Sequence, residues 1–389
     1  MLSIDDLPPE ILAEIIIFYA HEKFNPPIGL LYISRKWRDI ILSAPPCWSC
    51  LNITCSSDPE RPSIPIIASW IQKSGVSPLF ISLDMGETGD QLVPLLLPSS
   101  ALVQGKERFR ELSVYRASEW NLWNLVHLWP VPNLLSLTIA EDEGSSSFKP
   151  PLELLEFPLF LRNDPQAPRL STLHLSHCRF DAPRCELSGV QELSLEYCTS
   201  SITGFRQSLR SMPNLLCMVL GPVGIDLEAT FVTRTLETPC TPESTDLVLR
   251  HIWSIKLHLE DYSIPILDNF LTPSLTHLTL AATVTKTSLD TMINFLSQKD
   301  LPLKYLGAAL LGAYSLHSLA LILPTLPKME TLHLCVRHVT FHPLAVKNHP
   351  ALKGFKIQFE PPPKSTRHWE ELFDDQPEYQ VSGRLFPDR

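Results

Sequence analysis

Glycine is scarce in this sequence, with 14 residues among 389, whereas proline is abundant, with 36. This combination favours many short rigid turns between helices and strands over long flexible linkers. Clusters of lysine and arginine are lacking as well, and the formal net charge is −10, from 32 basic and 42 acidic residues. Because nucleic acids and anionic membranes select basic surfaces, we expect neither a nucleic acid nor a membrane as the main partner.

Motifs of catalysis and metal binding are also missing. The chain has no G-x-S-x-G, no G-x-x-x-x-G-K, no G-x-G-x-x-G and no H-E-x-x-H. Cys47 and Cys50 form a C-x-x-C, but a zinc site needs a second pair, and the next cysteines are Cys55 and Cys178. We therefore expect a non-catalytic protein with no catalytic residue, no metal ligand and no cofactor.

An export signal is not evident. The N-terminal residues MLSIDDLPPE are acidic and lack a basic segment followed by an apolar run. Nine scattered cysteines then indicate reduced thiols, so we expect a cytoplasmic or nuclear protein, or one found in both compartments. Tyr305 to Pro327 contains no charged residue, but serine, histidine and proline interrupt it and a repeat pattern runs through it, so no membrane span is predicted.

The first 48 residues carry two apolar patterns of helical period. The first runs from Ile11 to Tyr19 after two prolines, and the second runs from Leu30 to Ile41. Fewer than 50 residues bury too little surface to form a stable core alone. This segment therefore needs the next domain, a partner, or both.

The same segment carries a recognisable motif. The motif comprises Leu7-Pro8-x-Glu10-Ile11-Leu12-x-Glu14-Ile15 and Ile33-Ser34-Arg35-Lys36-Trp37-Arg38. It resembles the F-box. Together with Trp48, Leu51-x-Ile53 and Trp70-Ile71-x-Lys73-Ser74-Gly75, it is similar to the large F-box family of mushroom-forming fungi over about the first 85 residues. Residues 22–27 depart from the family pattern, where an Asp- and Leu-rich link is usual.

The resemblance implies partners. In that family the F-box binds a Skp-type adaptor, which joins it to the cullin and RING subunits of a ubiquitin ligase, and the rest of the chain selects a protein substrate. The apolar residues of the motif are the candidate adaptor-binding residues, although some of them must instead be internal core. They are Leu7, Pro8, Ile11, Leu12, Ile15, Ile33 and Trp37.

From residue 50 onward the pattern L-x-x-L-x-L recurs. Its second apolar position falls at residues 81, 112, 137, 173, 193, 218, 255, 278, 306, 332 and 355. Most intervals lie in the range of about 20–29 residues that is typical of leucine-rich repeats. The predicted fold is an α/β repeat solenoid with a parallel concave sheet. We expect an F-box helical motif at 1–48, an irregular leucine-rich-repeat array at 49–360 and a C-terminal cap or tail at 361–389.

The middle residue of each L-x-L should point away from the core, because side chains alternate along a strand. These residues and their outward neighbours form the predicted substrate-binding concave face, although binding at the loops or at the tail is an equal alternative. The face consists of His174, Glu192, Ser194, Glu196, His258, His277, Thr279, Thr331, His333 and Lys356. His174, His258 and His333 are separated by intervening strands, each about 4.8 Å across, so we do not expect them to share a metal ion.

The leading hypothesis is a substrate-recognition subunit of a Skp–cullin–F-box ubiquitin ligase, monomeric within that complex. A leucine-rich-repeat interaction scaffold acting outside a ligase is the alternative. Leu51 and Ile53 are expected to begin the first strand of the array. We therefore also predict that the F-box helices pack against residues 50–85 as an N-terminal cap.

Overall fold

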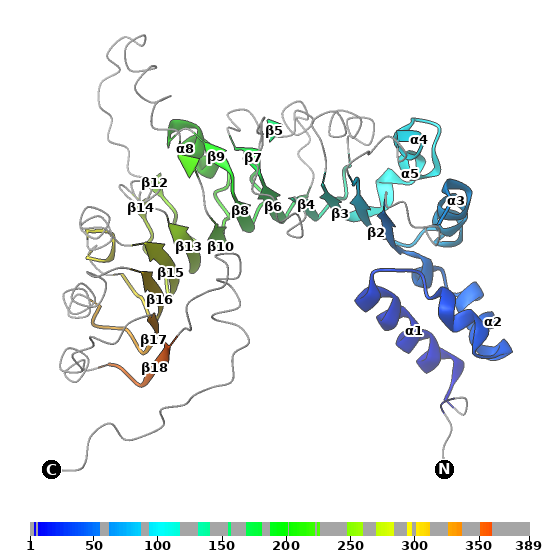
Figure 1. The fold of residues 1–389 in the computed structure, drawn as a ribbon, viewed down its shortest axis with the longest axis horizontal. Coiled ribbons are helices and arrows are strands. Elements are labelled where there is room, and N and C mark those ends of the chain that lie inside the picture. Colours follow the sequence, from blue (N-terminus) through cyan, green and yellow to red (C-terminus); the bar gives the residue numbers. More distant parts are fainter. Residues whose placement is uncertain are drawn as a thin grey trace, which may run out of the picture. The chain divides into compact units, whose positions relative to one another are not determined.

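The computed structural model places the chain in two compact units, Met1–Val190 and Gln191–Arg389. Both units are α/β and are built on a long parallel sheet (Figure 1). The predicted tail at 361–389 lies outside the described residues. The structure describes residues 4, 7–54, 62–86, 93–116, 131–140, 155–156, 169–180, 187–200, 202–221, 224–225, 247–259, 270–283, 294–297, 301–311, 326–336 and 351–359.

The first unit begins with four short helical segments, α1 (Pro9–Lys23), η2 (Ile28–Tyr32), α2 (Arg35–Ser43) and η3 (Pro45–Trp48). Helix α1 starts at a proline, whose missing N–H is not needed in the first turn. It ends where Phe24 adopts the left-handed conformation, with φ of 52°. Helix α2 is capped by Ser34, whose hydroxyl accepts a hydrogen bond from the Trp37 backbone N–H at 3.3 Å. Both predicted helices are therefore present.

The sheet of the first unit follows chain order. Its strands are β1 (Cys50–Thr54), β2 (Leu79–Asp84), β3 (Phe109–Tyr115), β4 (Ser136–Ala140) and β6 (Thr172–Ser176), all parallel. The segments between them include α3 (Ile64–Lys73), α4 (Val93–Leu96), α5 (Ala101–Gln104) and η5 (Lys106–Arg108). A short parallel pair also forms between β5 (Leu155–Glu156) and β7 (Cys178–Arg179).

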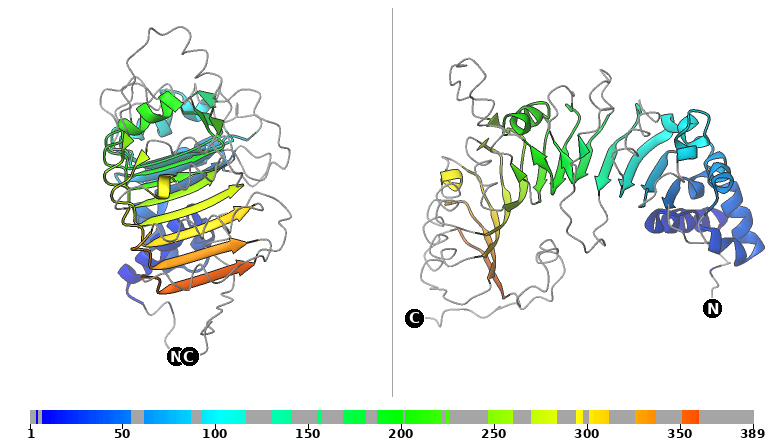
Figure 2. Two further views of the ribbon diagram at one scale, coloured as in Figure 1. Left: turned by 90° about the vertical axis from the view of Figure 1, so that its left-hand side faces the viewer. Right: turned by 45° about the horizontal axis from the view of Figure 1, so that its top comes forward.

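The second unit repeats this plan, and its strands lie side by side in Figure 2. They are β8 (Glu192–Glu196), β10 (Cys217–Leu220), β13 (Ser254–Leu259), β15 (His277–Thr283), β16 (Tyr305–Leu311), β17 (Thr331–Val336) and β18 (Gly354–Phe359). Helix α8 (Ile202–Arg210) joins β8 to β10. Two short parallel pairs accompany the sheet, β9 (Thr199–Ser200) with β11 (Gly224–Ile225) and β12 (Leu247–Val248) with β14 (Phe270–Leu271).

The predicted repeat positions are register partners. In the first unit Leu51, Ile81, Leu112, Leu137 and Leu173 lie opposite one another on successive strands. In the second unit the same holds along one row of the sheet, and the parallel sheet predicted from the L-x-L pattern is confirmed. That row comprises Leu193, Met218, Ile255, Leu278, Leu306, Leu332 and Phe355.

Prolines recur in a turn that precedes several of these strands. Before β4, the Leu134 N–H donates to the Val131 carbonyl at 3.2 Å, which places Pro132 second in the turn. The fixed φ of proline suits that position. Equivalent turns precede β10, β15 and β17. In each of them proline preorganises the turn before the strand and is not itself the first residue of the strand.

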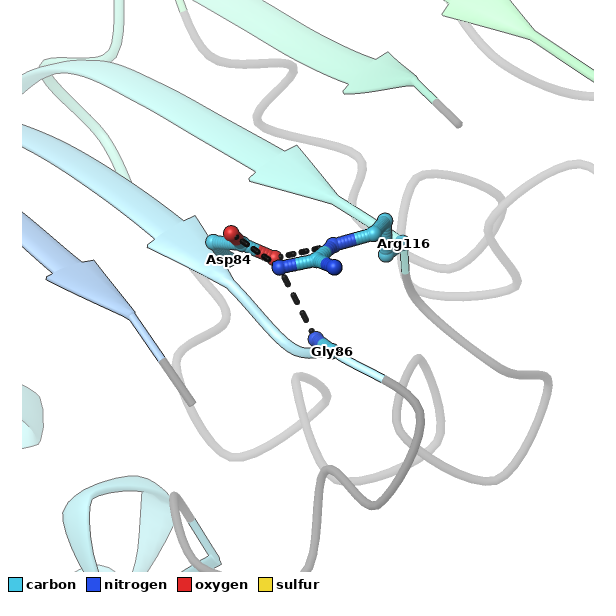
Figure 3. Close-up of polar contacts among 3 residues, drawn as sticks. All are labelled: Asp84, Gly86 and Arg116. Carbon is cyan, nitrogen blue, oxygen red and sulfur yellow. Dashed lines mark hydrogen bonds and ion pairs between the residues drawn. The ribbon is translucent and has the colours of Figure 1, made fainter. Parts of the chain in front are cut away.

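A polar clamp joins the ends of β2 and β3 in the first unit (Figure 3). Arg116 follows β3 with φ of 53°, an unfavourable conformation for a residue with a side chain. Its Nε donates to Asp84 Oδ1 at 2.7 Å, and the Gly86 N–H donates to the same oxygen at 3.2 Å. Arg116 Nη2 also donates to Asp84 Oδ2 at 2.5 Å, so the guanidinium contact is bidentate.

Among the described residues, no helix is both long enough and apolar enough to cross a membrane. The uncharged segment from Tyr305 begins as strand β16, which ends at Leu311. Residues 312–325 lie outside the described part of the chain.

Candidate functional site

Helix α1 is apolar on two faces. Leu12, Ile16 and Ala20 recur every fourth residue and are fully buried. The other face carries large apolar side chains that are exposed to solvent, a set that we call the α1 stripe. It consists of Ile11, at 48% exposure, Ile15 at 41%, Phe18 at 70% and Tyr19 at 39%. Residues three, four and seven apart lie on one side of a helix, so these side chains form a continuous apolar surface.

The seven predicted adaptor-binding residues divide between surface and core. Ile11, Ile15, Pro8 and Ile33 are exposed, Ile33 at 54%. Leu7 is half-buried, and its carbonyl accepts a hydrogen bond from Lys36 Nζ at 2.8 Å.

Leu12 and Trp37 are internal, so they are the members of the predicted set that belong to the core, in line with the expectation that some of them are internal. They belong to one core cluster with Ile16, Ile41 and Trp48. The reason is geometric, because consecutive helical residues point about 100° apart, so Ile11 and Leu12 cannot face the same side.

Three exposed aromatic residues beside these were missed. Phe18 and Tyr19 lie about one turn beyond Ile15 in the stripe, and Tyr32 is 79% exposed next to Ile33. The helical spacing of Phe18 from Ile11 and Ile15 was the signal that could have found it.

The helical segment packs against α3 and β2, as predicted. The Trp48 indole N–H donates to the Ile41 carbonyl at 2.9 Å, and Lys73 Nζ lies 4.3 Å from the centre of the Trp48 ring. Trp70 on α3 packs against the same core. The rings of His21 on α1 and Phe80 on β2 meet edge to face at 5.0 Å between centroids. The exposed stripe is therefore presented by a helix that is anchored to the sheet.

Cys47 and Cys50 of the C-x-x-C lie at the junction of η3 and β1, and both are fully buried. Burial raises the pKa of each thiol to about 11. Both are therefore protonated at neutral pH, and neither is activated as a nucleophile or as a metal ligand.

The predicted concave-face residues differ in accessibility. His174 in the first unit is half-buried, as are Ser194, Glu196 and Thr331 in the second. Glu192 and His277 are exposed. His258 and Lys356 lie within β13 and β18, but their side chains are outside the described part.

Two residues predicted to face solvent are buried. Thr279 is 8% exposed and His333 is 6% exposed. Outward side chains on adjacent strands lie about 5 Å apart and cover one another, so an outward direction does not ensure exposure.

The strand register also corrects one residue of the predicted concave face, the middle residue of the L-x-L in β13. Lys256, not His258, lies between Val219 and Thr279. His258 is two residues further along and lies opposite Ala281. Within the described part of the chain, no three His, Cys, Asp or Glu side chains converge on a common point as metal ligands would.

Comparison with protein-family models finds no family that matches this chain. A search of curated proteins likewise finds no match.

Proposed function

We propose that this chain is the substrate-recognition subunit of a Skp–cullin–F-box ubiquitin ligase. In this proposal residues 1–48 are an F-box that binds a Skp-type adaptor, and residues 49–360 are a leucine-rich-repeat solenoid that binds a protein substrate. The chain itself is non-catalytic. It accelerates ubiquitin transfer by holding the substrate near the conjugating enzyme, which raises the effective concentration of substrate lysines.

The observation that carries the proposal is the α1 stripe. A helix that is apolar around most of its circumference belongs in a core or an interface. One face of α1 is in the core, and Ile11, Ile15 and Phe18 on the other are exposed. Contiguous exposed apolar side chains of this size mark interaction sites on soluble proteins.

The geometry also supports a fixed placement of a bound adaptor relative to the first strands of the first unit. The helices that carry the stripe pack around Trp48 and against Trp70 of α3, and His21 of α1 meets Phe80 of β2. An adaptor bound at α1 would therefore keep a fixed position relative to the first strands, without a flexible linker between them.

The test is co-purification of the full chain with a Skp-type adaptor. Ile11→Glu/Ile15→Glu places charges in the stripe while leaving the buried face intact. We expect adaptor affinity to fall at least about 30-fold, the loss typical of a disrupted interface centre.

Val76→Glu is the matched control. Val76 is 94% exposed in the turn after α3, outside the helices that carry the stripe. Val76→Glu introduces one of the same carboxylates, against two in the stripe variant, and should leave adaptor binding unchanged. Equal adaptor retention by the stripe variant and the wild type, with circular dichroism showing both folded, would contradict the proposal.

A further inference from the structure

The outward face of the first strands is covered where helix α1 meets it. Cys50, Phe80 and Glu111 are register partners on β1, β2 and β3, and we call them the Phe80 row. They follow or precede the buried Leu51 and Leu112 on their strands or lie opposite such residues, so their side chains point to the outward face. Cys50 is nevertheless fully buried, and the other two are half-buried. In Figure 1, α1 lies on one side of β2, whereas α4 and α5 lie on the other.

His21 makes the contact from the side of the helix. It stands in the last turn of α1, is exposed, and its ring meets the Phe80 ring at 5.0 Å between centroids and an interplanar angle of 70°. Glu111 is the register neighbour of Phe80 on the next strand, about 5 Å away. The imidazole therefore stands close to the carboxylate, and its charge acts to lower the pKa of Glu111.

A positive charge at His21 is stabilised from two directions. The last carbonyls of a helix carry partial negative charge, and His21 lies among them. The carboxylate of Glu111 lies on the other side, in a half-buried place where charges are screened less than in water. Histidine is also the side chain whose charge ordinarily changes between pH 5 and pH 8. The contact between helix and sheet therefore contains a group that can gain or lose its charge near neutral pH.

We propose that His21, Phe80 and Glu111 form a proton-sensitive latch that fastens the last turn of α1 to the outward face of β2 and β3. A proton on His21 closes the latch, because the imidazolium and the carboxylate then attract each other. Loss of that proton leaves the ring contact with Phe80 alone. The latch is intramolecular, but it holds the helix that carries the α1 stripe, so any effect on an adaptor rests on the function proposed above.

The latch is strongest in a window of mildly acidic pH. At the upper limit of the window His21 loses its proton, and at the lower limit Glu111 gains one. Burial raises the pKa of Glu111 by more than the charge of His21 lowers it, so the lower limit lies above the ordinary range of an exposed glutamate. The ionised carboxylate is costly at this half-buried place, and His21 offsets part of the cost.

The titratable groups of the strands around the pair are neutral or engaged elsewhere. Cys50 faces Glu111 in the Phe80 row, and its thiol, with a pKa of about 11, is neutral below pH 8. The partner of Glu111 on β4 is Ser136, which carries no charge. The other titratable residues of β2 and β3 are Asp84, bound by Arg116, Arg110, bound to the Asn133 carbonyl, and Tyr115 at the far end of β3.

The groups on the helical segments do not change charge between pH 6 and pH 8 in the way that histidine does. On α2, which packs against α1, Lys36 Nζ donates to the Leu7 carbonyl near the start of α1, and Arg38 Nε donates to the Leu31 carbonyl. Cys47 of η3 has a thiol pKa of about 11. The remaining charged residues on α2 and within two turns of His21 on α1 are exposed, and they are Glu14, Glu22, Lys23, Arg35 and Asp39.

Hydrogen exchange of the full chain, followed by mass spectrometry at pH 6.0 and pH 8.0, measures the latch. The N–H groups of Phe24 and Asn25 report on the last turn of α1, because they donate to the His21 and Ala20 carbonyls at 3.2 and 3.1 Å. Each observed rate is divided by the intrinsic rate at the same pH. We expect these amides to be about threefold better protected at pH 6.0, the size usual for an ion pair with an exposed member. Equal protection at the two pH values overturns the inference.

Variants show whether the pair is responsible. His21→Gln and, separately, Glu111→Gln should remove the pH dependence, whereas His21→Lys keeps a cation and should keep protection high at pH 8.0. His251→Gln removes an exposed imidazole of the second unit and should retain the pH dependence of the wild type. Circular dichroism confirms that each variant is folded. A pH dependence that persists in His21→Gln or Glu111→Gln, or protection of His21→Lys at pH 8.0 no higher than that of the wild type, overturns the inference.

Adaptor retention by the wild type separates this inference from the proposed function. The exchange measurement uses the chain alone and needs no adaptor. If the last turn of α1 shows the expected pH dependence and no adaptor is retained, the latch stands and the ligase function fails. If the adaptor is retained and the last turn shows no pH dependence, the latch fails and the proposed function stands.

Discussion

Arg108 shows how a single side chain can close the end of a helix. Its guanidinium donates to the Ile71 and Ser77 carbonyls, both at 3.2 Å, and to Ser74 Oγ at 2.9 Å, just after the last turn of α3. Terminal carbonyls of a helix lack intrahelical partners, so a cation there satisfies them and complements the helix dipole. Its partial burial lowers the pKa of the guanidinium.

Arg108→Met should therefore lower the free energy of unfolding by about 2 kcal/mol, because buried acceptors lose charged donors. The midpoint of urea unfolding measures the effect. Arg110→Met is the control, since the Arg110 guanidinium donates at 3.1 Å to the Asn133 carbonyl, away from the end of α3. A loss at Arg108 no greater than that at Arg110 would contradict the capping role.

The buried thiols of Cys47 and Cys50 predict a pH dependence. Burial raises the pKa of each from 9.0 to about 11 in the folded protein. Between these pH values the unfolded chain releases protons that the folded chain retains, so stability decreases as pH rises. We expect the stability advantage of the wild type over Cys47→Ala/Cys50→Ala to shrink from pH 9 to pH 11.

Urea midpoints of both proteins across that range provide the measurement. Taking the difference between them removes the titration of lysine and tyrosine, which the two proteins share. A difference that stays constant from pH 9 to pH 11 would show that the thiols do not titrate in this way.

Sequence patterns could not separate the roles of neighbouring residues at two places. Ile11 and Leu12 are both apolar in the same motif, yet one is exposed and the other is buried, because the side facing the core depends on tertiary packing. Ile255, Leu257 and Leu259 alternate along β13, so two outward residues were equally possible in that strand. Pairing with β15 shows that Lys256, which lies opposite Thr279, is the outward residue at this position.

At the scale of the element, we expect substitutions on the buried face and on the exposed face of α1 to have opposite effects on stability and on adaptor binding. Leu12→Ala removes a fully buried side chain and should cost about 3 kcal/mol of unfolding free energy. Ile15→Ala removes a side chain that is 41% exposed and should cost less than about 1 kcal/mol. Under the proposed function, Ile15→Ala should still weaken adaptor binding.

Thermal unfolding measures the stability of both variants, and titration with the adaptor measures their binding. Adaptor binding should be normal for Leu12→Ala below its unfolding temperature. If both variants lose stability to the same extent, the two faces of α1 are not distinct.

The strands were the most predictable elements. L-x-x-L-x-L repeats place a leucine or its equivalent at the same depth of every strand, and a parallel sheet aligns those positions in register. Leu278, Leu306 and Leu332 are partners in this way. Exposure on the outward face was less predictable, as Thr279 and His333 show, because it depends on which long side chains lie beside each residue.

At the scale of the whole molecule, Trp48 links the helices that would bind an adaptor to the sheet that would bind a substrate. It is 1% exposed, lies in the core formed by α1 and α2, and is separated from β1 by one residue. Trp48→Ala should cost about 4 kcal/mol, the usual range for a large buried aromatic residue.

Because Trp48 lies between the helices and β1 in the chain, the loss should not stay within the helices. Hydrogen exchange followed by mass spectrometry should show faster exchange in α1 and α2 and also in β1 and β2, where Leu51 and Ile81 are fully buried register partners. Trp253→Ala, which removes a half-exposed indole in the second unit, is the control and should leave these segments unchanged. If Trp48→Ala increases exchange in the helices alone, the helices and the first strands unfold independently, and the fixed presentation of an adaptor relative to the sheet is lost.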